Sequence, residues 1–208
     1  MRTCPHLLHA PALDQAGLNT VLSIGLPFTL QQAWPSAPEA DLQAGHACIS
    51  WTPAALYVAA QLSDTAIVNP ERRFNERAFL AGDAFEIFLR SLPGESYIEL
   101  HVTPHNTQFQ LRIPSAEAFH DQPDADWRVH DSLFTSIATI QSEAWQVLAE
   151  IPAQALGRSA FAPADELQCC FARYDYEAEG AQPVLSASPA FTKLSFHRVH
   201  EWPVIRLA

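Results

Sequence analysis

Residues 81–114, AGDAFEIFLRSLPGESYIELHVTPHNTQFQLRIP, decide the fold class of this chain, because apolar and polar side chains alternate along three successive segments. Alternation with a period of two is typical of β-strands that are buried on one face. Leu92-Pro93-Gly94 and Pro104-His105-Asn106 indicate turns between the segments, since proline fixes φ and asparagine tolerates a left-handed backbone. The stretch therefore predicts a three-stranded antiparallel sheet.

The two faces of this sheet are expected to differ in chemistry. One interpretation of the polar face is that its side chains simply meet water, with cross-strand pairs adding a few tenths of a kcal/mol. The other is that the face is concave and binds a polar ligand, for which its groups offer hydrogen-bond donors and acceptors. The polar face is predicted to carry Glu86, Glu99, His101, Gln110 and Arg112, and the apolar face Phe85, Ile87, Leu89, Ile98, Leu100, Val102, Phe109, Leu111 and Ile113.

The rest of the chain also reads as β-structure. Sixteen prolines and only seven glycines divide the 208 residues into short extended pieces, and 48% hydrophobic residues are enough for a proper core. We therefore predict an all-β fold in a single domain, residues 1–208, with a helix at 70–80, a helical turn at 152–156 and a loop at 115–126 long enough to act as a lid. Strands are predicted at 19–30, 46–51, 56–62, 84–90, 97–103, 108–113, 133–141, 144–151, 167–174 and 199–207, with hairpin turns at 52–55 and 142–143.

The charge of the chain argues against a polyanionic partner. Lysine and arginine total 12 against 23 acidic residues, a net charge of −11, whereas nucleic acids and anionic membrane surfaces attract clustered cations. No segment approaches the ~20 apolar residues of a membrane span. The first 17 residues, MRTCPHLLHAPALDQAG, are broken by prolines and histidines where a signal peptide needs an apolar run. These observations predict a cytoplasmic protein.

Catalytic and metal-binding motifs are weak in this sequence. Nine histidines form no metal-ligand spacing, and no nucleophile or nucleotide-binding motif is present, so no metal or other cofactor is predicted. Glu86 and Glu99 could face each other across neighbouring strands, which leaves a hydrolase that uses Glu86, Glu99 and His101 as an alternative to a non-catalytic protein. Four cysteines are expected to be buried thiols, and the adjacent Cys169 and Cys170 should point to opposite faces of one strand.

Two of the five tryptophans are candidate ligand platforms. An indole ring stacks on the apolar C–H face of a sugar, and Trp51 and Trp127 lie next to predicted turns, where the rim of a site is expected. The alternative is that they only plug the end of a sandwich. Trp145 alternates with Val147 and Ala149 and is predicted to lie in the core.

The order of six segments along the chain gives a family resemblance. The chain is similar to family 9 carbohydrate-binding modules and the related DOMON-like domains over most of its length from about Trp34 onward. The segments that carry the resemblance are ALYVAAQLSD (55–64), GDAFEIFL (82–89), SYIELHVTP (96–104), AWQVLAEIPAQAL (144–156), CFARYDY (170–176) and FHRVHEWPVIRL (196–207).

The resemblance implies a two-sheet antiparallel β-sandwich, immunoglobulin-like or jelly-roll-like, with one or two short helices. It also implies non-catalytic binding of a carbohydrate or a sugar-like metabolite on a concave sheet face. The loop before GDAFEIF has Phe74 and Phe79 where sugar-binding members are expected to have a tryptophan. Some relatives bind haem through an axial methionine with a histidine. The only methionine here is Met1, which leaves a bis-histidine site as the open alternative for haem. A sandwich that docks a protein partner is the remaining alternative.

The expected ligand site is centred on the strand at 97–103. By the resemblance, Glu99, His101 and Thr103 supply polar sugar contacts, with Glu86 and Arg173 as further candidates. Arg112 is expected to lie near Glu99 and to hold its carboxylate ionised. The full predicted set is Glu86, Glu99, His101, Thr103, Arg112, Arg173, Trp51 and Trp127.

Overall fold

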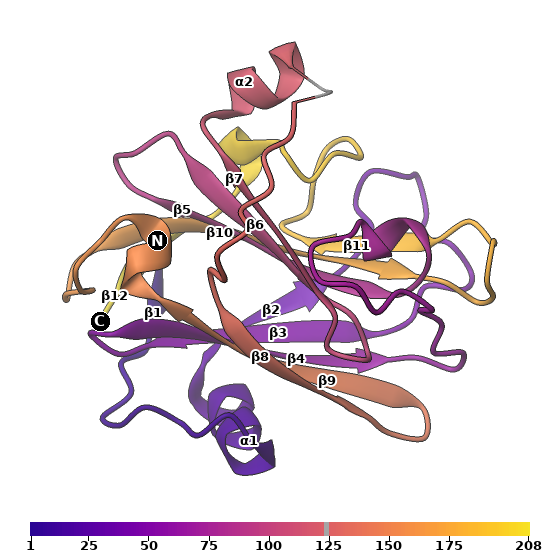
Figure 1. Cartoon of the computed structure of the whole chain (residues 1–208), viewed down its shortest axis with the longest axis horizontal. Coiled ribbons are helices and arrows are strands. Elements are labelled where there is room, and N and C mark those ends of the chain that lie inside the picture. Colours follow the sequence, from indigo (N-terminus) through magenta and orange to yellow (C-terminus); the bar gives the residue numbers. More distant parts are fainter. Residues whose placement is uncertain (123–124) are drawn as a thin grey trace.

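Two β-sheets face each other across one apolar core (Figure 1). The computed structural model describes residues 1–122 and 125–208. All strand pairs are antiparallel except the pair of β1 with β12, so the predicted all-β sandwich is confirmed. Sheet A comprises, in order, β1 (Arg2–Cys4), β12 (Val204–Leu207), β10 (Glu166–Asp175), β5 (Ala84–Ser91), β6 (Tyr97–Val102) and β7 (Gln108–Ile113), and β11 (Val184–Ser188) pairs with β10 beside β12; sheet B comprises β2 (Leu26–Leu30), β3 (Gly45–Trp51), β4 (Ala55–Ser63), β9 (Ala144–Pro152) and β8 (Thr135–Ile140).

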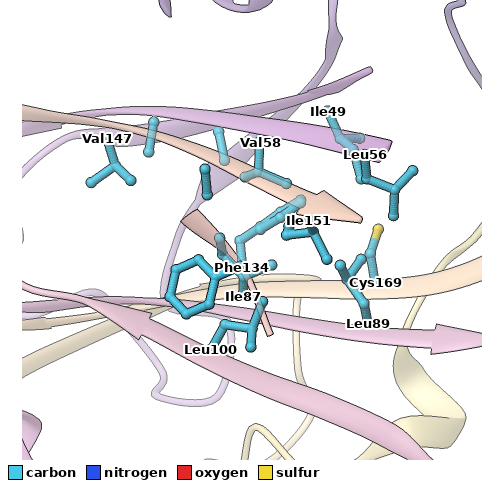
Figure 2. Close-up of a cluster of buried hydrophobic side chains, with 14 of the residues drawn as sticks. Ile49, Leu56, Val58, Ile87, Leu89, Leu100, Phe134, Val147, Ile151 and Cys169 are labelled. Carbon is cyan, nitrogen blue, oxygen red and sulfur yellow. The ribbon is translucent and has the colours of Figure 1, made fainter. Parts of the chain in front are cut away.

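The space between the sheets holds the main core. Figure 2 shows Ile49 and Val58 from sheet B above Ile87 and Leu100 from sheet A, with Phe134 between the layers. Trp145 is also part of this core, as predicted. The adjacent Cys169 and Cys170 point to opposite faces of β10, and only Cys169 enters the inter-sheet core. The central strands are buried on both faces, because further layers cover the outer face of each sheet.

A helix covers the outer face of sheet B, where a strand was predicted. Residues 19–30 divide into the end of α1 (Gln15–Ile24) and β2. Asp14 caps the helix, since its side chain accepts a hydrogen bond from the Gly17 backbone N–H at 2.8 Å. Leu18 and Val21, one helical turn apart, are buried against the sheet. The β-branched residues of this segment favoured a strand in the prediction. In the structure, the cap and the helical spacing of the apolar residues decide the element instead.

The phase of β7 is opposite to the prediction. Directly paired residues of an antiparallel hairpin share a face, and His101 is paired with Phe109 while Leu100 is paired with Gln110. Gln110 is therefore fully buried on the core side of sheet A. Its side chain donates to the carbonyl groups of residues 129 and 131 at 2.7 Å and accepts from the amide of residue 133 at 2.8 Å. These bonds allow an amide on the apolar side.

Most of the predicted strands are present. Eight of them, from β3 to β10, and both hairpins are confirmed to within a few residues, whereas β1 and β11 were not predicted. The predicted helix at 70–80 is reduced to a 3-10 turn, Ala78–Leu80, and the helical turn at 152–156 is a 3-10 turn, Ala153–Leu156. The predicted strand at 199–207 consists of a 3-10 turn, Val199–Glu201, and β12.

The predicted loop at 115–126 contains a helix. This helix, α2 (Ala116–Asp121), lies over sheet A on the side of the molecule opposite α1 (Figure 1). Residues 123 and 124 of the predicted lid lie outside the described residues. In the part of the chain that the structure describes, neither helix is long and apolar enough to span a membrane.

Candidate functional site

A pocket of about 510 Å³ opens on the outer face of sheet A. Its floor is formed by β5, β6, β7, β10 and β11, and its walls by three segments that cross the sheet: residues 77–79, the α2 region with residues 125–128, and residues 194–197. This volume lies within the range of about 300–1,000 Å³ that is usual for small-molecule sites. The polar face of the sheet is therefore a concavity.

Two carboxyl groups of the pocket lining, those of Glu86 and Glu99, contact the buried imidazole of His101. His101 Nε2 lies 2.7 Å from Glu99 Oε1 in a hydrogen bond. Its Nδ1 lies 3.2 Å from Glu86 Oε1, an ion-pair contact that is too poorly aligned for a hydrogen bond. Glu86 and His101 are paired across β5 and β6, so both point to the same face. We call Glu86, His101 and Glu99 the Glu–His–Glu cluster; all three are at least nine-tenths buried.

The cluster shares its protons unequally. Burial raises the pKa of Glu86, and the Glu99 charge adds to that rise, while His101 opposes it. Burial also acts on Glu99, but the hydrogen bond and charge of His101 outweigh it, so the pKa of Glu99 is lowered. Burial would lower the pKa of His101, yet the two flanking carboxyls raise it. Glu99 is therefore the ionised member, and the available proton is shared between His101 and Glu86.

A second histidine borders the cluster. The Tyr97 hydroxyl lies 2.8 Å from Nδ1 of His197, and burial raises the pKa of this phenol, so it donates the hydrogen bond. The neutral imidazole then carries its proton on Nε2, which faces Glu99 Oε2 at 3.6 Å. Phe119 of α2 stacks on the other side of the His197 ring, with ring centroids 3.6 Å apart. Among the described residues, Glu99 Oε2 has no hydrogen-bond partner, so this buried oxygen can accept a bond from a ligand.

Aromatic rings surround the polar floor. Phe79 contacts the rings of His101, Phe109 and Tyr174 at centroid distances of 5.1, 5.9 and 5.4 Å. Tyr174 also meets Phe196 edge-on at 6.1 Å. Trp127, half-buried, lines the same pocket, as expected for a ring at the rim. The site therefore combines apolar ring surfaces with a few buried polar groups.

Two arginines stand at the rim. Arg128 is held by Asp126 through two contacts of 2.8 Å, both on exposed side chains. The exposed Arg77 lines the pocket, and its positive charge contributes to the lowered pKa of Glu99. The rim is therefore charged, whereas the depth of the pocket is aromatic and acidic.

Four of the predicted ligand-binding residues lie outside the pocket, the first three being Arg112, Thr103 and Trp51. Arg112 follows the reversed phase of β7 and lines a separate hollow beside Leu156. Thr103 is fully buried, where its hydroxyl accepts from the Thr107 amide at 3.0 Å and shapes the β6–β7 turn. Trp51 is part of the inter-sheet core rather than a rim. Arg112 was expected beside Glu99, but the side chain that contacts Glu99 is that of His101.

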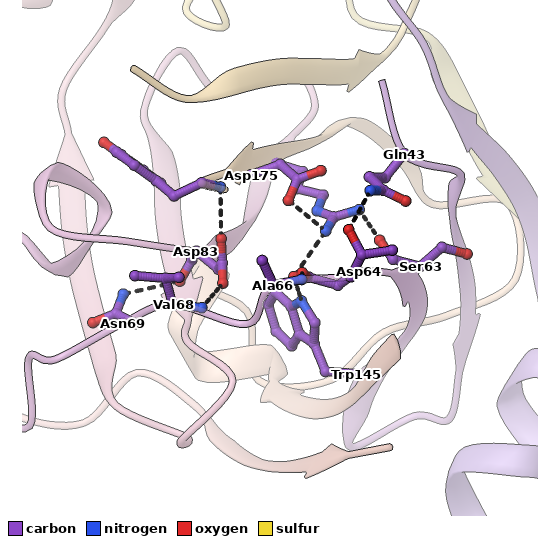
Figure 3. Close-up of polar contacts among 12 residues, drawn as sticks. Gln43, Ser63, Asp64, Ala66, Val68, Asn69, Asp83, Trp145 and Asp175 are labelled. Carbon is purple, nitrogen blue, oxygen red and sulfur yellow. Dashed lines mark hydrogen bonds and ion pairs between the residues drawn. The ribbon is translucent and has the colours of Figure 1, made fainter. Parts of the chain in front are cut away.

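Arg173, a further predicted ligand-binding residue, holds together a buried acidic cluster at the end of the sandwich. Its guanidinium lies 3.0 Å from Asp64 Oδ2 and 2.9 Å from Asp175 Oδ1, and it donates to the Ser63 carbonyl at 2.6 Å. Figure 3 shows Asp64 and Asp175 pointing toward one another beside Trp145, which donates to Asp64 at 3.1 Å. Arg173 is therefore not among the residues that line the pocket, and its guanidinium contacts other parts of the fold.

Two clusters bring possible metal ligands within 4.8 Å of one another: the Glu–His–Glu cluster, and Asp64 with Asp83 and Asp175. In the first, both imidazole nitrogens already face carboxyl oxygens. In the second, Arg173 supplies the positive charge, and burial raises the pKa of Asp83 to about 7 and that of Asp175 to about 6. His101 is already in contact with both carboxyls of the first cluster, and Arg173 supplies positive charge to the second, so we assign neither cluster to a metal ion.

Several pocket residues were not predicted from the sequence. His197 and Phe196 begin a segment that was read as the closing part of the fold, and Tyr174 was read only as part of a strand. Phe109 was assigned to the core because it is apolar. Its place could have been found from the register of the β6–β7 hairpin, in which Phe109 must share a face with His101.

Comparison with known proteins gives a likeness in structure and none in sequence. No family model matches the chain, and no curated protein matches it. A proposed carbohydrate-binding protein from Bacteroides uniformis superposes with a TM-score of 0.75 at 10% identity, covering 100% of this chain and 98% of the other. The fold is similar to that of family 9 carbohydrate-binding modules.

Two structures of such a module from Caldicellulosiruptor kristjanssonii carry this likeness. The complex with cellotriose has a TM-score of 0.67 at 15% identity and covers 99% of this chain and 92% of the other. The complex with glucose has a TM-score of 0.66 at 16% identity and covers 100% and 96%. The expected resemblance to this family is thus confirmed for the fold.

Proposed function

We propose that this chain binds a carbohydrate or a sugar-like polyol, without turnover, in the pocket on sheet A. The observation that carries the proposal is the buried Glu99 Oε2, an acceptor without a hydrogen-bond partner among the described residues, on a side chain that lines the pocket together with aromatic rings. Sugar hydroxyls donate to such oxygens while the C–H faces of the sugar pack on rings. The similar folds that were solved with glucose and cellotriose support the same class of ligand.

The position of His101 favours binding over hydrolysis. A glycosidase needs two carboxyl groups on either side of the scissile bond, with open space between them. Here one oxygen of each carboxyl already contacts a nitrogen of the His101 ring, so neither group stands free as an independent acid or nucleophile. The same contacts suit a rigid acceptor array that orients hydroxyl groups.

Titration calorimetry of the full chain with glucose, galactose, mannose and their β-1,4-linked disaccharides tests this proposal. We expect a dissociation constant of about 1 mM or tighter for at least one sugar, a free energy of about −4 kcal/mol. Glu99→Gln should weaken binding by about 1–3 kcal/mol, because an amide nitrogen replaces an acceptor oxygen. Trp127→Ala should also weaken it through loss of a ring surface.

Arg112→Gln is the matched control, because it removes a polar residue of the same sheet that lies outside the pocket. It should leave the dissociation constant unchanged. The proposal fails if no sugar binds at millimolar concentration, or if Arg112→Gln weakens binding while Glu99→Gln does not. Release of a chromophore from an aryl glycoside would instead show turnover.

A further inference from the structure

The floor of the pocket has more hydrogen-bond acceptor atoms than protons that its own groups can donate to them. The Glu–His–Glu cluster contains two carboxyls for one imidazole, and each imidazole nitrogen already faces one of them. A protonated imidazole balances one negative charge and leaves the second carboxyl either protonated or charged. Because the cluster is at least nine-tenths buried, an uncompensated second charge is costly. The cluster is therefore neutral with two titratable protons, or carries one negative charge with a single proton.

The groups around the cluster do not supply the missing positive charge. From the 194–197 wall, burial lowers the pKa of His197, so it faces Glu99 as a neutral ring. From β10, burial raises the pKa values of Tyr174 and Cys170, which remain neutral. The charge of Arg77 contributes to the lowered pKa of Glu99, but Arg77 lies at the exposed rim, where solvent screens that charge. The depth of the pocket therefore has a net excess of acceptors.

The walls next to these acceptors suit a cation. Phe79, Phe109 and Tyr174 form a connected group of rings around His101, with centroid distances between 4.9 and 5.9 Å. The faces of aromatic rings attract ammonium groups, and the attraction grows when the site excludes water. A charge-assisted hydrogen bond to a carboxylate is also about twice as strong as a neutral one.

We propose that the ligand of this pocket is an amino sugar, whose ammonium group lies between the free oxygen of Glu99 and the carboxyl of Glu86. The inference rests on the proposed function and narrows its ligand class. The ammonium supplies the positive charge that the Glu–His–Glu cluster lacks, and the sugar ring packs on the aromatic walls. Glu86 then ionises, and its proton leaves to solvent.

Proton release separates this inference from simple sugar binding. A neutral sugar adds no charge, so it gives the cluster no reason to lose a proton. An ammonium favours the ionised form of Glu86, whose pKa is raised by burial, and so lowers that pKa on binding. The number of protons released can be measured from the dependence of the binding enthalpy on the ionisation enthalpy of the buffer.

The experiment is titration calorimetry of the full chain at pH 6.5 with D-glucosamine, D-glucose and N-acetyl-D-glucosamine, each in two buffers of different ionisation enthalpy. The galacto and manno series are measured in the same way, so that hydroxyl configuration is covered. In at least one series we expect the amino sugar to bind about ten-fold more tightly than its neutral parent, with a release approaching one proton. The N-acetylated sugar, which has no ammonium, should lose both effects.

Glu86→Gln should abolish the proton release and the preference for the amino sugar. Glu95→Gln is the matched control, because it removes one negative charge from an exposed turn and should preserve both effects. Equal binding of amino and neutral sugars without proton release would overturn this inference and leave the proposed function standing. Failure of every sugar to bind would overturn both.

Discussion

Replacing Arg173 tests whether this buried arginine is structural, as the fold indicates, or part of a ligand site, as the sequence predicted. Arg173→Met removes the guanidinium that contacts both Asp64 and Asp175, each of which is buried. Breaking a buried ion pair by removing one partner costs about 3–5 kcal/mol, because the remaining charge loses its compensation. Asp64 keeps its hydrogen bond from Trp145, which limits but does not remove the loss.

The cost should depend on pH, because protonated carboxyls need no cation. Burial already raises the pKa of Asp175 to about 6 and that of Asp83 to about 7, and removing Arg173 raises the pKa of Asp175 further. The pKa of Asp175 is already about 6 in the wild-type fold, so an aspartate that stays protonated in the variant adds up to about 1.4 kcal/mol to the loss for each pH unit above 6. The loss of unfolding free energy should therefore be about 3–5 kcal/mol at pH 7.5 and about 2 kcal/mol smaller at pH 5.

Urea denaturation at both pH values measures the loss, with Arg112→Met as the matched control. Arg112 lies beside a shallow hollow and is half-buried, so its replacement should change the unfolding free energy by no more than about 0.5 kcal/mol. A loss below about 1 kcal/mol at pH 7.5 for Arg173→Met would refute the assigned role. So would weaker sugar binding in a variant of unchanged stability.

Two further predictions concern the Glu–His–Glu cluster. The unfolding free energy of the wild-type chain should fall as pH rises from about 5 to 8, because burial raises the pKa of Glu86 and the unfolded chain therefore loses this proton at lower pH than the folded chain. In urea denaturation across this pH range, Glu86→Gln should make the decline less steep. An unchanged slope would show that another group causes the decline. The triple variant Glu86→Leu/His101→Leu/Glu99→Leu should melt at an equal or higher temperature yet lose sugar binding, because well-packed apolar residues often replace buried ion pairs without loss of stability. A large drop in its melting temperature would assign the cluster to folding rather than to binding.

The sequence predicted the sheets better than the phase of every strand. The alternation along β5 and β6 is strict, and their faces were assigned correctly: Leu100 lies in the core, and His101 lies on the opposite face. The assignment failed at β7 because the outer face of sheet A is itself covered and lined with rings. An apolar residue such as Phe109 can then belong to either face, and only the hairpin register decides.

The sequence brought the three members of the Glu–His–Glu cluster together correctly but missed most residues of the pocket walls. Glu86, Glu99 and His101 come from adjacent strands, so their proximity follows from local pairing. Trp127 was placed by its position after a loop. His197 lies nearly a hundred residues from Glu99 in the sequence, and no periodicity relates the two. Arg173 was misplaced because a lone charge in a strand does not reveal which face holds its partners.

The cost of the Glu–His–Glu cluster itself points to a ligand. The sandwich already obtains its core from the space between the sheets, where Leu100 and Ile87 pack, so the outer face of sheet A needs no buried charge to fold. Burying two carboxyls and an imidazole nevertheless opposes folding, since each gives up hydration and Glu99 Oε2 gains no hydrogen bond from the described residues in return. Groups that weaken a fold persist at positions where they contact something outside it. The described residues around the cluster donate no hydrogen bond to Glu99 Oε2 and do not balance the charge of the second carboxyl. A hydroxyl-bearing ligand with one positive charge would do both.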